Sequence, residues 1–415
     1  MKRTPKGKIF NDPVYGFVTV PTDLTFRLIE HPYFQRLRRI RQLGLTNLVY
    51  PGALHTRFHH AMGAMYLMCE AVEVIRSKGT EISEQEAEAA YIAILLHDIG
   101  HGPFSHALET SIVHNVTHED ISGIFMDKLN ETFEGKLTLA IKVFRNTYHK
   151  KFLHQLVSSQ LDMDRLDYLR RDSFFTGVSE GIVSSDRIVK MLDVVNDELV
   201  VEDKGIYSIE KFIIARRLMY WQVYLHKTVL SAEHLLVNIL KRAKQLAMSG
   251  EKLFCTPSLE LFLCNRITRS AFKRPEVLEA FANLDDYDIM SAIKVWTTHK
   301  DPILAELCSS MVNRQLYAVE LQNKPFDGAY VEKLYKKAEK KLKLKPVKDE
   351  MSYFVFTGAV QNNAYSSDNI RINIKFKNGQ VMDIAEAADI FNISVLSKPV
   401  KKYFLCYPKS LREQK

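Results

Sequence analysis

A histidine and an aspartate that directly follow an apolar run, His97 and Asp98, constrain the fold of this chain more than any other feature. The run at residues 89–96 has the composition of a buried helix. Burying an imidazole and a carboxylate without partners is costly, so such groups are kept where they are hydrogen-bonded, paired or bound to a metal. The pair therefore predicts a polar site at the end of a buried helix.

More histidines and carboxylates gather around this pair in the sequence. They are His59, His60, His101, His106 and His118, followed by Asp162, Asp164, Asp167 and Asp172. A single histidine is more often a core or surface residue than a ligand, but a cluster favours ligation. Two imidazoles and two carboxylates form a mixed nitrogen and oxygen site, which suits Fe, Mn, Co, Ni or Zn better than Ca. We therefore expect a divalent transition metal bound between distant helices.

The segment SSQLDMDRLDYLRRD places further polar groups at helical spacing. Asp164, Tyr168 and Asp172 are each four residues apart and share one helix face, with Arg165 beside it. The remaining charged residues are interpreted as a solvated face with local ion pairs, namely Asp167, Arg170 and Arg171. Asp164 becomes a candidate ligand if the histidine cluster binds a metal.

Composition indicates an ordinary soluble protein, since 46% of the 415 residues are hydrophobic and 26% are charged. No apolar run approaches the roughly 18 residues that a membrane span needs, and the basic N-terminus lacks the apolar stretch of a secretory signal. The five cysteines are odd in number and show no CxxC spacing, which favours reduced thiols. We expect a cytoplasmic protein with no membrane contact.

The formal net charge of +8 favours polyanionic partners such as nucleotides or nucleic acid. Much of the excess lies at residues 333–348, which carry eight lysines and one glutamate. A solvated helix face is the plainer interpretation of this segment, and a phosphate-binding surface is the alternative.

Periodicity and turn signals predict a mainly α protein. We expect a hairpin at residues 8–21 and helices over most of residues 24–242, including 153–170 and 209–245. Thr56 and a Ser83–Glu86 capping box would begin two of these helices, and Gly100 would end the second. Strands are expected at 352–360, 370–376 and 402–406, with a hairpin turn at 377–379 and a short helix at 384–391. The predicted domains are a helical core at 1–250, a helical extension at 251–324 and a small basic α+β lobe at 325–415.

Six segments together resemble the HD-domain metal-dependent phosphohydrolases, and within them the deoxynucleoside triphosphate triphosphohydrolase branch that includes the SAM-and-HD-domain protein. In chain order they are FQRLRRIRQLG, VYPGALHTRFHHAMG, LLHDIGHGPFSH, VTHED, LDMDRLDYLRRD and VYLHK. An HD pair alone is a weak signal, whereas HDIGHGPFSH together with DMDRLDY is specific. The resemblance covers nearly the whole chain, more weakly in the C-terminal lobe, and no segment corresponds to the SAM domain.

This resemblance implies a role for particular residues. The implied metal ligands are His60, His97, Asp98 and Asp164. The implied catalytic and phosphate-contacting residues are His101, His106 and His118, with Glu109 orienting one of them. The triphosphate would be held by Arg57, Arg165, Tyr168 and Arg216, the sugar 3′-hydroxyl by Gln42 and Asp172, and the 2′ position would be crowded by Leu43 and Tyr224. A Mg ion on the substrate phosphates is compatible with this set.

Four positions depart from the family pattern. Glu109 stands where the family usually has Asp, and Arg165 replaces Lys. His59 replaces Glu, and Leu225 stands where the animal enzyme has Gln near the base. These changes leave the phosphate chemistry intact and leave the base preference open.

The implied activity is hydrolysis of a deoxynucleoside triphosphate to a deoxynucleoside and inorganic triphosphate. One alternative is an HD phosphohydrolase acting on another nucleotide phosphoester, such as a nucleoside monophosphate. The other is a nucleic-acid-binding regulator that keeps the fold and uses the basic C-terminal lobe. The intact ligand set argues against an inactive module, and Arg216 argues against a purely structural role.

The animal relative is a nucleotide-bridged tetramer, and several positions matching its regulatory pockets are present here. They are Lys8, Asn11, Gln35 and Arg38 before the metal site, Arg187, His226 and Lys227 after it, and Glu30, which stands in place of Asp. The alternative is that Arg38, Arg39 and Arg41 form a solvated basic face. We predict a homo-oligomer, a dimer or tetramer, whose size or activity responds to GTP or a deoxynucleoside triphosphate.

Overall fold

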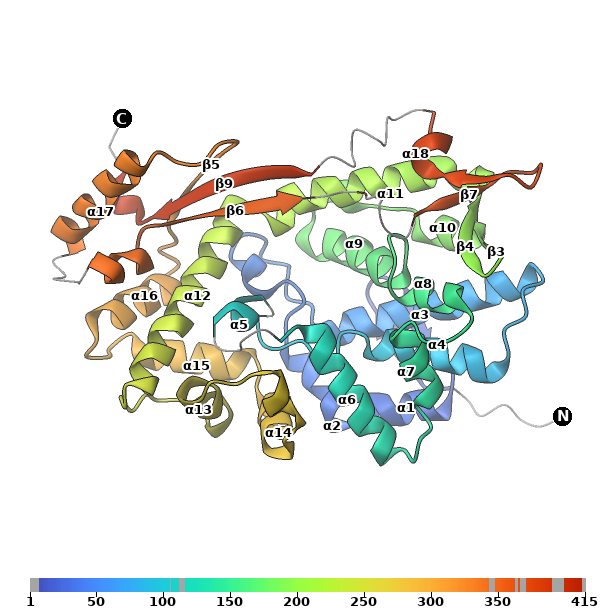
Figure 1. The fold of residues 1–415 in the computed structure, drawn as a ribbon, viewed down its shortest axis with the longest axis horizontal. Helices are drawn as coiled ribbons and strands as arrows, with labels where there is room; N and C mark the ends of the chain where they lie inside the picture. The colour runs from blue at the N-terminus through green and yellow to red at the C-terminus, as the bar shows by residue number, and fades with distance from the viewer. Residues whose placement is uncertain are drawn as a thin grey trace.

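The chain folds mainly into α-helices in the computed structural model, which confirms the predicted fold class. The structure describes residues 7–104, 106–111, 116–342, 348–362, 365, 371–389 and 399–412. Figure 1 shows an elongated molecule whose helices form the body and whose C-terminal strands follow one long edge. None of the described helices is both long and apolar enough to cross a membrane.

The described part of the chain begins with the predicted hairpin. β1 (Ile9–Asp12) and β2 (Gly16–Thr19) pair in antiparallel fashion, with Asp12 opposite Gly16. The Asp12 carboxylate accepts two backbone amides inside the turn, and Gly16 adopts a φ of +77°, which favours glycine. The hairpin prediction is therefore confirmed.

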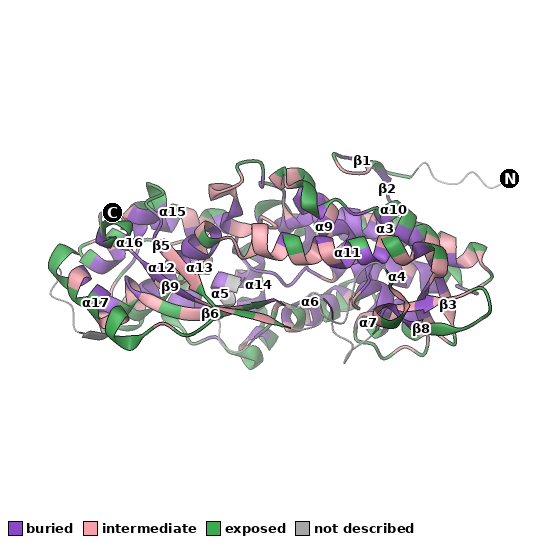
Figure 2. Ribbon diagram, turned by 90° about the horizontal axis from the view of Figure 1, so that it is seen from above, coloured by how far each residue is buried: buried purple, intermediate pink, exposed green. Residues whose placement is uncertain are grey.

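The described helices of the N-terminal half build a body in which one helix is buried. They are α1 (Asp23–Glu30), α2 (Pro32–Gln35), α3 (Arg57–Ser77), α4 (Glu84–Leu96), α5 (His106–Ser111), α6 (His118–Thr132), α7 (Thr138–Phe144), α8 (Lys151–Val157), α9 (Met163–Thr176) and α10 (Ser185–Met191). The buried helix is α4, which begins with the predicted capping box between Ser83 and Glu86 and is enclosed from Ala89 to Leu96. α3 packs against both α4 and α9, and Figure 2 shows that these helices carry much of the buried surface.

Two predicted long helices are interrupted. Residues 153–170 divide into α8 and α9 because Asp162 accepts the Arg165 amide (2.8 Å) and thereby caps a new helix. Residues 209–245 divide into α11 (Ile206–Met219), a π-helical turn (Tyr220–Tyr224) and α12 (Lys227–Met248). Hydrophobic periodicity continues across both breaks, so it could not reveal them.

Gly100 does not end α4, which stops at Leu96. Its role is close packing, since a Cβ at this position would lie 2.2 Å from the His118 carbonyl oxygen and 2.3 Å from the Ser122 amide nitrogen. Ser122 in turn donates to the His97 carbonyl (2.8 Å) and accepts from the Gly100 amide (2.9 Å). The turn that follows α4 is thus fixed against α6.

Two further sheets use strands from distant parts of the chain. One has the order β3-β4-β7-β8 and the other β5-β9-β6. Their strands are β3 (Leu192–Val195), β4 (Glu198–Glu202), β5 (Ala318–Gln322), β6 (Phe356–Asn362), β7 (Asn373–Lys375), β8 (Val381–Asp383) and β9 (Val400–Tyr407). Strands are confirmed near all three predicted C-terminal positions, whereas β3 and β4 lie in a region expected to be helical.

The C-terminal half adds helices to one end of the molecule. They are α13 (Pro257–Cys264), α14 (Pro275–Asn283), α15 (Asp286–Trp296), α16 (Pro302–Val312) and α17 (Gly328–Leu342), whereas α18 (Ile384–Ala387) lies toward the other end, against α11, β7 and β8 (Figure 1). α18 is shorter than the expected helix, whose last residues lie outside the described ones. α17 exposes Lys336, Lys340 and Lys341, as the lysine run indicated. β7 pairs with β4 across the expected boundary at residue 325, and the division into domains stays a prediction.

Candidate metal centre

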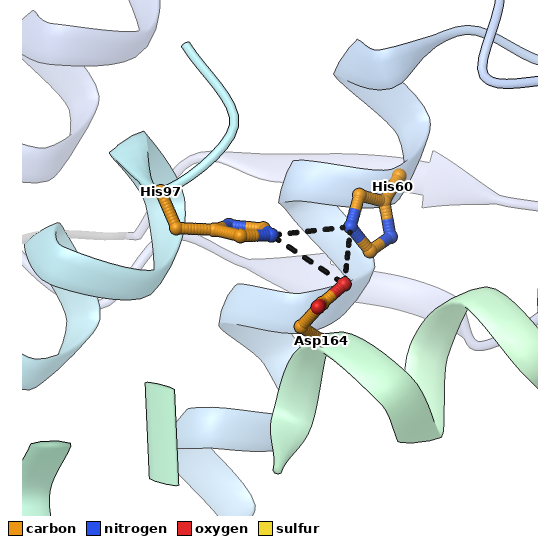
Figure 3. A group of neighbouring side chains, drawn as sticks. All are labelled: His60, His97 and Asp164. Atoms are coloured by element: carbon orange, nitrogen blue, oxygen red, sulfur yellow. Dashed lines mark hydrogen bonds and ion pairs between the residues drawn. The ribbon is translucent and has the colours of Figure 1, made fainter. Parts of the chain in front are cut away.

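Three helices bring two imidazoles and a carboxylate together in the middle of the body. His60 lies in the first turn of α3, His97 follows the last residue of α4, and Asp164 lies in the first turn of α9. The Nε2 atoms of His60 and His97 are 3.4 Å apart, and Asp164 Oδ1 is 3.1 Å from the first and 3.5 Å from the second. Figure 3 shows the three side chains pointing at one another.

Asp98 joins this cluster to a second one. Its Oδ1 lies 3.4 Å from His97 Nε2, and its Oδ2 lies 3.7 Å from His60 Nε2. The same Oδ1 lies 3.3 Å from His101 Nε2, and the His101 ring stacks on the His118 ring at 3.8 Å. Ligand atoms of Asp98, His101 and His118 lie within 4.8 Å of one another. The four expected metal ligands and two of the expected catalytic histidines therefore occupy one continuous site.

The Nδ1 atoms of His60 and His97 are hydrogen-bonded to other groups of the protein, and this orients the Nε2 atom of each ring toward the cluster. His60 Nδ1 lies 2.7 Å from Asp167 Oδ2, and His97 Nδ1 lies 2.6 Å from the Ile94 carbonyl oxygen. Imidazoles that bind metals are commonly oriented in this way by a carboxylate or carbonyl on the other nitrogen. Two inward Nε2 atoms with the carboxylates of Asp98 and Asp164 fit a divalent transition metal.

Electrostatics at the cluster show how strongly its groups interact. Burial would raise the pKa of Asp164, but hydrogen bonds from His60 and His97 hold it below its usual range. Burial would likewise lower the pKa of His60, but its contacts with Asp164 and Asp167 raise that pKa to about 10. The carboxylates are thus charged, and His60 carries a proton that a bound cation would replace.

Asp167 and Arg171 are not solvated, and that interpretation is wrong for both. Each side chain is fully buried, and Arg171 Nε and Nη2 donate to the two oxygens of Asp167 at 2.9 and 3.0 Å. Arg171 Nη1 also donates to Asp12 of the hairpin at 2.7 Å. Arg170 does remain at the surface, where it pairs with Asp186. The buried chain Asp12–Arg171–Asp167 fixes His60, and its only signal in the sequence is an i,i+4 pair.

Gly63, one turn after His60, leaves room for this chain of charges. A Cβ at Gly63 would lie 2.0 Å from Asp167 Oδ1 and 2.1 Å from Arg171 Nη2. Both atoms are fully buried and cannot move into solvent. Glycine at this position is therefore required by the approach of α3 to α9.

Arg36 fixes the loop that follows the His97–Asp98 pair. Its buried guanidinium donates to the carbonyls of Ile99 (3.0 Å) and His101 (2.9 Å) through Nη1. Through Nη2 it donates to Phe281 and Leu284 at the end of α14. The loop carrying His101 is thereby held against the helical extension.

The arginines expected to hold the triphosphate lie close to the metal cluster or are poised for a ligand. Arg57 Nη1 donates to Asp98 Oδ2 at 2.5 Å. Arg165 pairs with Asp162 through Nη1, and its Nε is buried without a hydrogen-bond partner in the described structure. The Nε of Arg216 is in the same state. Such buried donors are expected to meet a bound anion.

The residues expected at the sugar also meet. Tyr224 donates to Asp172 Oδ2 at 2.8 Å, and its ring packs edge-on against Tyr168 with centroids 6.2 Å apart. Gln42 lies on the opposite loop with Leu43, and its Oε1 is buried with no hydrogen-bond partner among the described residues. His55 binds the other oxygen of Asp172 at 2.8 Å. His55 was missed because a lone histidine before a helix cap carries no distinctive spacing.

Four other residues were expected at the site or at its departures from the family pattern, namely His106, Glu109, His59 and Leu225. The side chains of His106 and Glu109 lie outside the described residues, although α5 carries both. His59 accepts the Thr56 amide at 3.2 Å and so completes the cap of α3. The base-side position Leu225 ends the π-helical turn.

The expected regulatory positions make contacts within the chain. Gln35 accepts from Arg38, whose guanidinium stacks on Phe58 at 3.6 Å. Arg39 pairs with Asp285, so it is not simply solvated. Among the remaining positions, Lys8 lies over the Phe26 ring, Asn11 is in β1 and Glu30 is the last residue of α1. Arg187 lies in α10, His226 caps α12 and Lys227 is the first residue of α12. Their regulatory role stays a prediction.

Comparisons with known proteins agree with this arrangement. Residues 57–172 match the HD domain, and residues 183–255 match the HD associated region. A crystal structure of a phosphohydrolase from Bacteroides thetaiotaomicron superposes with a TM-score of 0.93 at 52% identity, over 97% of this chain and 99% of that one. The uncharacterised protein YwfO of Bacillus subtilis is 34% identical over 97% of this chain and 93% of its own.

A more distant relative has a named activity. The deoxynucleoside triphosphate triphosphohydrolase SAMHD1 homolog of Dictyostelium discoideum is 30% identical over 59% of this chain and 51% of its own length. The chain belongs to the HD-domain phosphohydrolases and is related to their deoxynucleoside triphosphate triphosphohydrolase branch.

Proposed function

We propose that this chain is a metal-dependent hydrolase that converts a deoxynucleoside triphosphate and water into a deoxynucleoside and inorganic triphosphate. The observation that carries the proposal is the convergence of His60, His97, Asp98 and Asp164, together with the buried Nε atoms of Arg165 and Arg216, which have no hydrogen-bond partner among the described residues. The named activity of the Dictyostelium relative supports the choice of substrate. A divalent cation held by these four residues would supply a Lewis acid that polarises the phosphate oxygens.

The reaction joins a water oxygen to the α-phosphorus, breaks the bond from that phosphorus to the 5′-oxygen and delivers a proton to the 5′-oxygen. Arg57 and Arg216 are proposed to offset the charge that develops on the phosphates, because a guanidinium group can donate two parallel hydrogen bonds to phosphate oxygens. His101 and His118, stacked beside Asp98, are proposed to contact the α-phosphate and the leaving oxygen. Arg36 keeps His101 in place for this role.

We expect product analysis to show triphosphate and deoxynucleoside in equal amounts. The purified protein is incubated with each deoxynucleoside triphosphate and Mn²⁺, and the products are separated by anion-exchange chromatography. A matched reaction with excess chelator should show no turnover. Release of pyrophosphate or monophosphate would contradict the proposed bond cleavage, and hydrolysis of monophosphates alone would favour the alternative phosphoesterase.

We expect ribonucleotides to be poor substrates, because the family resemblance assigns Tyr224 to the 2′ side of the sugar and we propose that its ring fills the space that a 2′-hydroxyl needs. Its position is fixed by the bond to Asp172 and by edge-on packing on Tyr168 and Tyr220. Overpacking typically costs about 1–3 kcal/mol, so kcat/KM should favour dATP over ATP by about 5- to 150-fold. Tyr224→Ala should weaken this preference, whereas Tyr224→Phe, which keeps the ring, should retain it. Equal kcat/KM for the two nucleotides in the wild type would refute the steric role.

We also propose that the protein forms a nucleotide-responsive homo-oligomer and that it can bind nucleic acid. The homo-oligomer and its response to nucleotide are supported by the positions around Arg38 and His226 alone. Binding of nucleic acid is supported by the exposed lysines of α17, a helix that lies at one end of the molecule (Figure 1). The nucleotide site itself favours the enzyme over a purely nucleic-acid-binding role.

A further inference from the structure

His55 is a buried histidine that contacts both sides of the proposed sugar site. It lies in the loop before α3 with only 2% of its surface exposed. Its Nε2 binds Asp172 Oδ1 at 2.8 Å, and its backbone carbonyl accepts the Gln42 amide at 3.0 Å. No expected role in catalysis, metal binding or regulation uses this residue.

We propose that His55 is a positioning residue that aligns Asp172 and Gln42 and thereby selects nucleotides that carry a 3′-hydroxyl. The inference rests on the proposed function, because it assigns Asp172 and Gln42 to the sugar. His55 touches neither the metal cluster nor the phosphate-binding arginines in the contacts described, so it acts on recognition of the sugar alone.

The first step of the argument is the fixed orientation of the Asp172 carboxylate. One oxygen binds His55 and the other binds the Tyr224 hydroxyl, each at 2.8 Å. A carboxylate has about four acceptor positions, and these two bonds leave positions for a ligand hydroxyl. Without His55, the carboxylate could rotate about its bond to Tyr224 and lose that alignment.

The second step is the rigidity of His55 itself. Its ring stacks on Phe175 with centroids 4.5 Å apart and planes 19° apart. Phe175 lies one turn after Asp172 in α9, so the histidine is held by the same helix that carries the carboxylate. The side chain is fully buried and cannot exchange its bond to Asp172 for one to bulk water.

The third step is the link to Gln42. The bond from the Gln42 amide to the His55 carbonyl is one of two backbone hydrogen bonds on either side of the bridge between Arg41 and Thr56, and the other runs from the Arg57 amide to the Ile40 carbonyl. The Gln42 side-chain oxygen is buried and has no hydrogen-bond partner in the described part of the chain. A hydroxyl donor that reaches this oxygen and Asp172 together would satisfy both, and His55 sets the spacing between them.

The test compares a deoxynucleoside triphosphate with its 2′,3′-dideoxy analogue, which lacks only the 3′-hydroxyl. Steady-state kinetics and equilibrium binding are measured for the wild type, His55→Ala, His55→Leu and His55→Gln. We expect the wild type to prefer the deoxynucleotide by about tenfold or more, the size expected for a hydrogen bond to a charged group. His55→Ala and His55→Leu should raise KM for the deoxynucleotide by about tenfold and leave the dideoxy analogue nearly unchanged.

Conservative rescue separates positioning from general packing. His55→Gln can still offer an amide donor to Asp172 and should recover most of the preference. His234→Ala is the matched control, because His234 is also packed on a phenylalanine, Phe404 at 4.7 Å, but lies in α12 on the C-terminal sheet. It should leave the preference intact. His55→Leu fills the space of the imidazole and carries the test if His55→Ala does not fold.

Two results would overturn the inference: an equal loss for both nucleotides in the His55 variants, or an unchanged preference. Binding measurements keep the role of His55 separate from the proposed reaction. If the wild type binds but does not hydrolyse deoxynucleotides, the proposed function fails, while the effect of His55 on the preference for the 3′-hydroxyl is still decided by the binding constants.

Discussion

The double variant His97→Ala, Asp98→Ala is expected to lose its bound metal and to turn over substrate at least about a thousandfold more slowly, a barrier increase of about 4 kcal/mol. Both residues offer ligand atoms to the cluster, and Asp98 also anchors Arg57. The fold should persist, because His60 remains paired with Asp164 at 3.1 Å and with Asp167 at 2.7 Å, although Arg57 loses the carboxylate with which it pairs and some stability is lost with it.

Metal content by mass spectrometry, circular dichroism and product release are measured on the same preparations. His149→Ala serves as the control, since His149 is an exposed histidine outside the cluster and should affect none of the three. Full metal occupancy in a folded double variant would show that the ligand assignment is wrong. A variant that retains turnover without metal would contradict the proposed chemistry as well.

Gly63→Ala should destabilise the protein by about 3–5 kcal/mol, the range expected when a buried ion pair is broken. Alanine inside a helix is ordinarily about 1 kcal/mol more favourable than glycine, so the predicted sign is opposite to the usual one. The reason is local, because the added methyl would lie 2.0 Å from Asp167 Oδ1 and displace the pair that Asp167 forms with Arg171. Chemical denaturation gives the free energy of unfolding directly.

Gly123→Ala is a matched control for this experiment. Gly123 is also buried inside a helix, α6, but a Cβ there meets nothing closer than Arg145 Nη2 at 3.4 Å. That change should be neutral or stabilising by up to about 1 kcal/mol. Similar destabilisation by both substitutions would contradict the argument from the Asp167–Arg171 pair.

Much of the cluster of histidines and aspartates could be predicted, because its residues stand out from their neighbours in the sequence. A histidine and an aspartate after the apolar run of α4 could be tolerated only with partners, and Asp164 lies in a segment of unusual carboxylate density. Helix starts at Ser83 and Thr56 follow from bonds to the residue three positions farther on, since Ser83 Oγ accepts the Glu86 amide and His59 Nδ1 accepts the Thr56 amide. These features depend on residues only a few positions apart.

The remaining parts depend on contacts between distant segments, which sequence spacing does not encode. Arg171 is buried because Asp12 of the hairpin reaches it, so an ordinary surface ion pair and a buried one look alike in the sequence. His55 acquires its role from Asp172, more than a hundred residues later. β3 and β4 pair with each other, but β4 is completed only by a strand from the C-terminal region.

That completion of β4 by β7 has a consequence for how the protein is made. Residues 60–164 of the metal cluster leave the ribosome well before β7, which pairs with Val200 and Val201 from about 170 residues farther along the chain. At synthesis rates of about 5–20 residues per second, the edge of β4 stays open for about 10 to 35 seconds. An unpaired strand edge can pair with other chains. The residues of the histidine and aspartate cluster are therefore all translated while the β3–β4 sheet still lacks the strand that completes it.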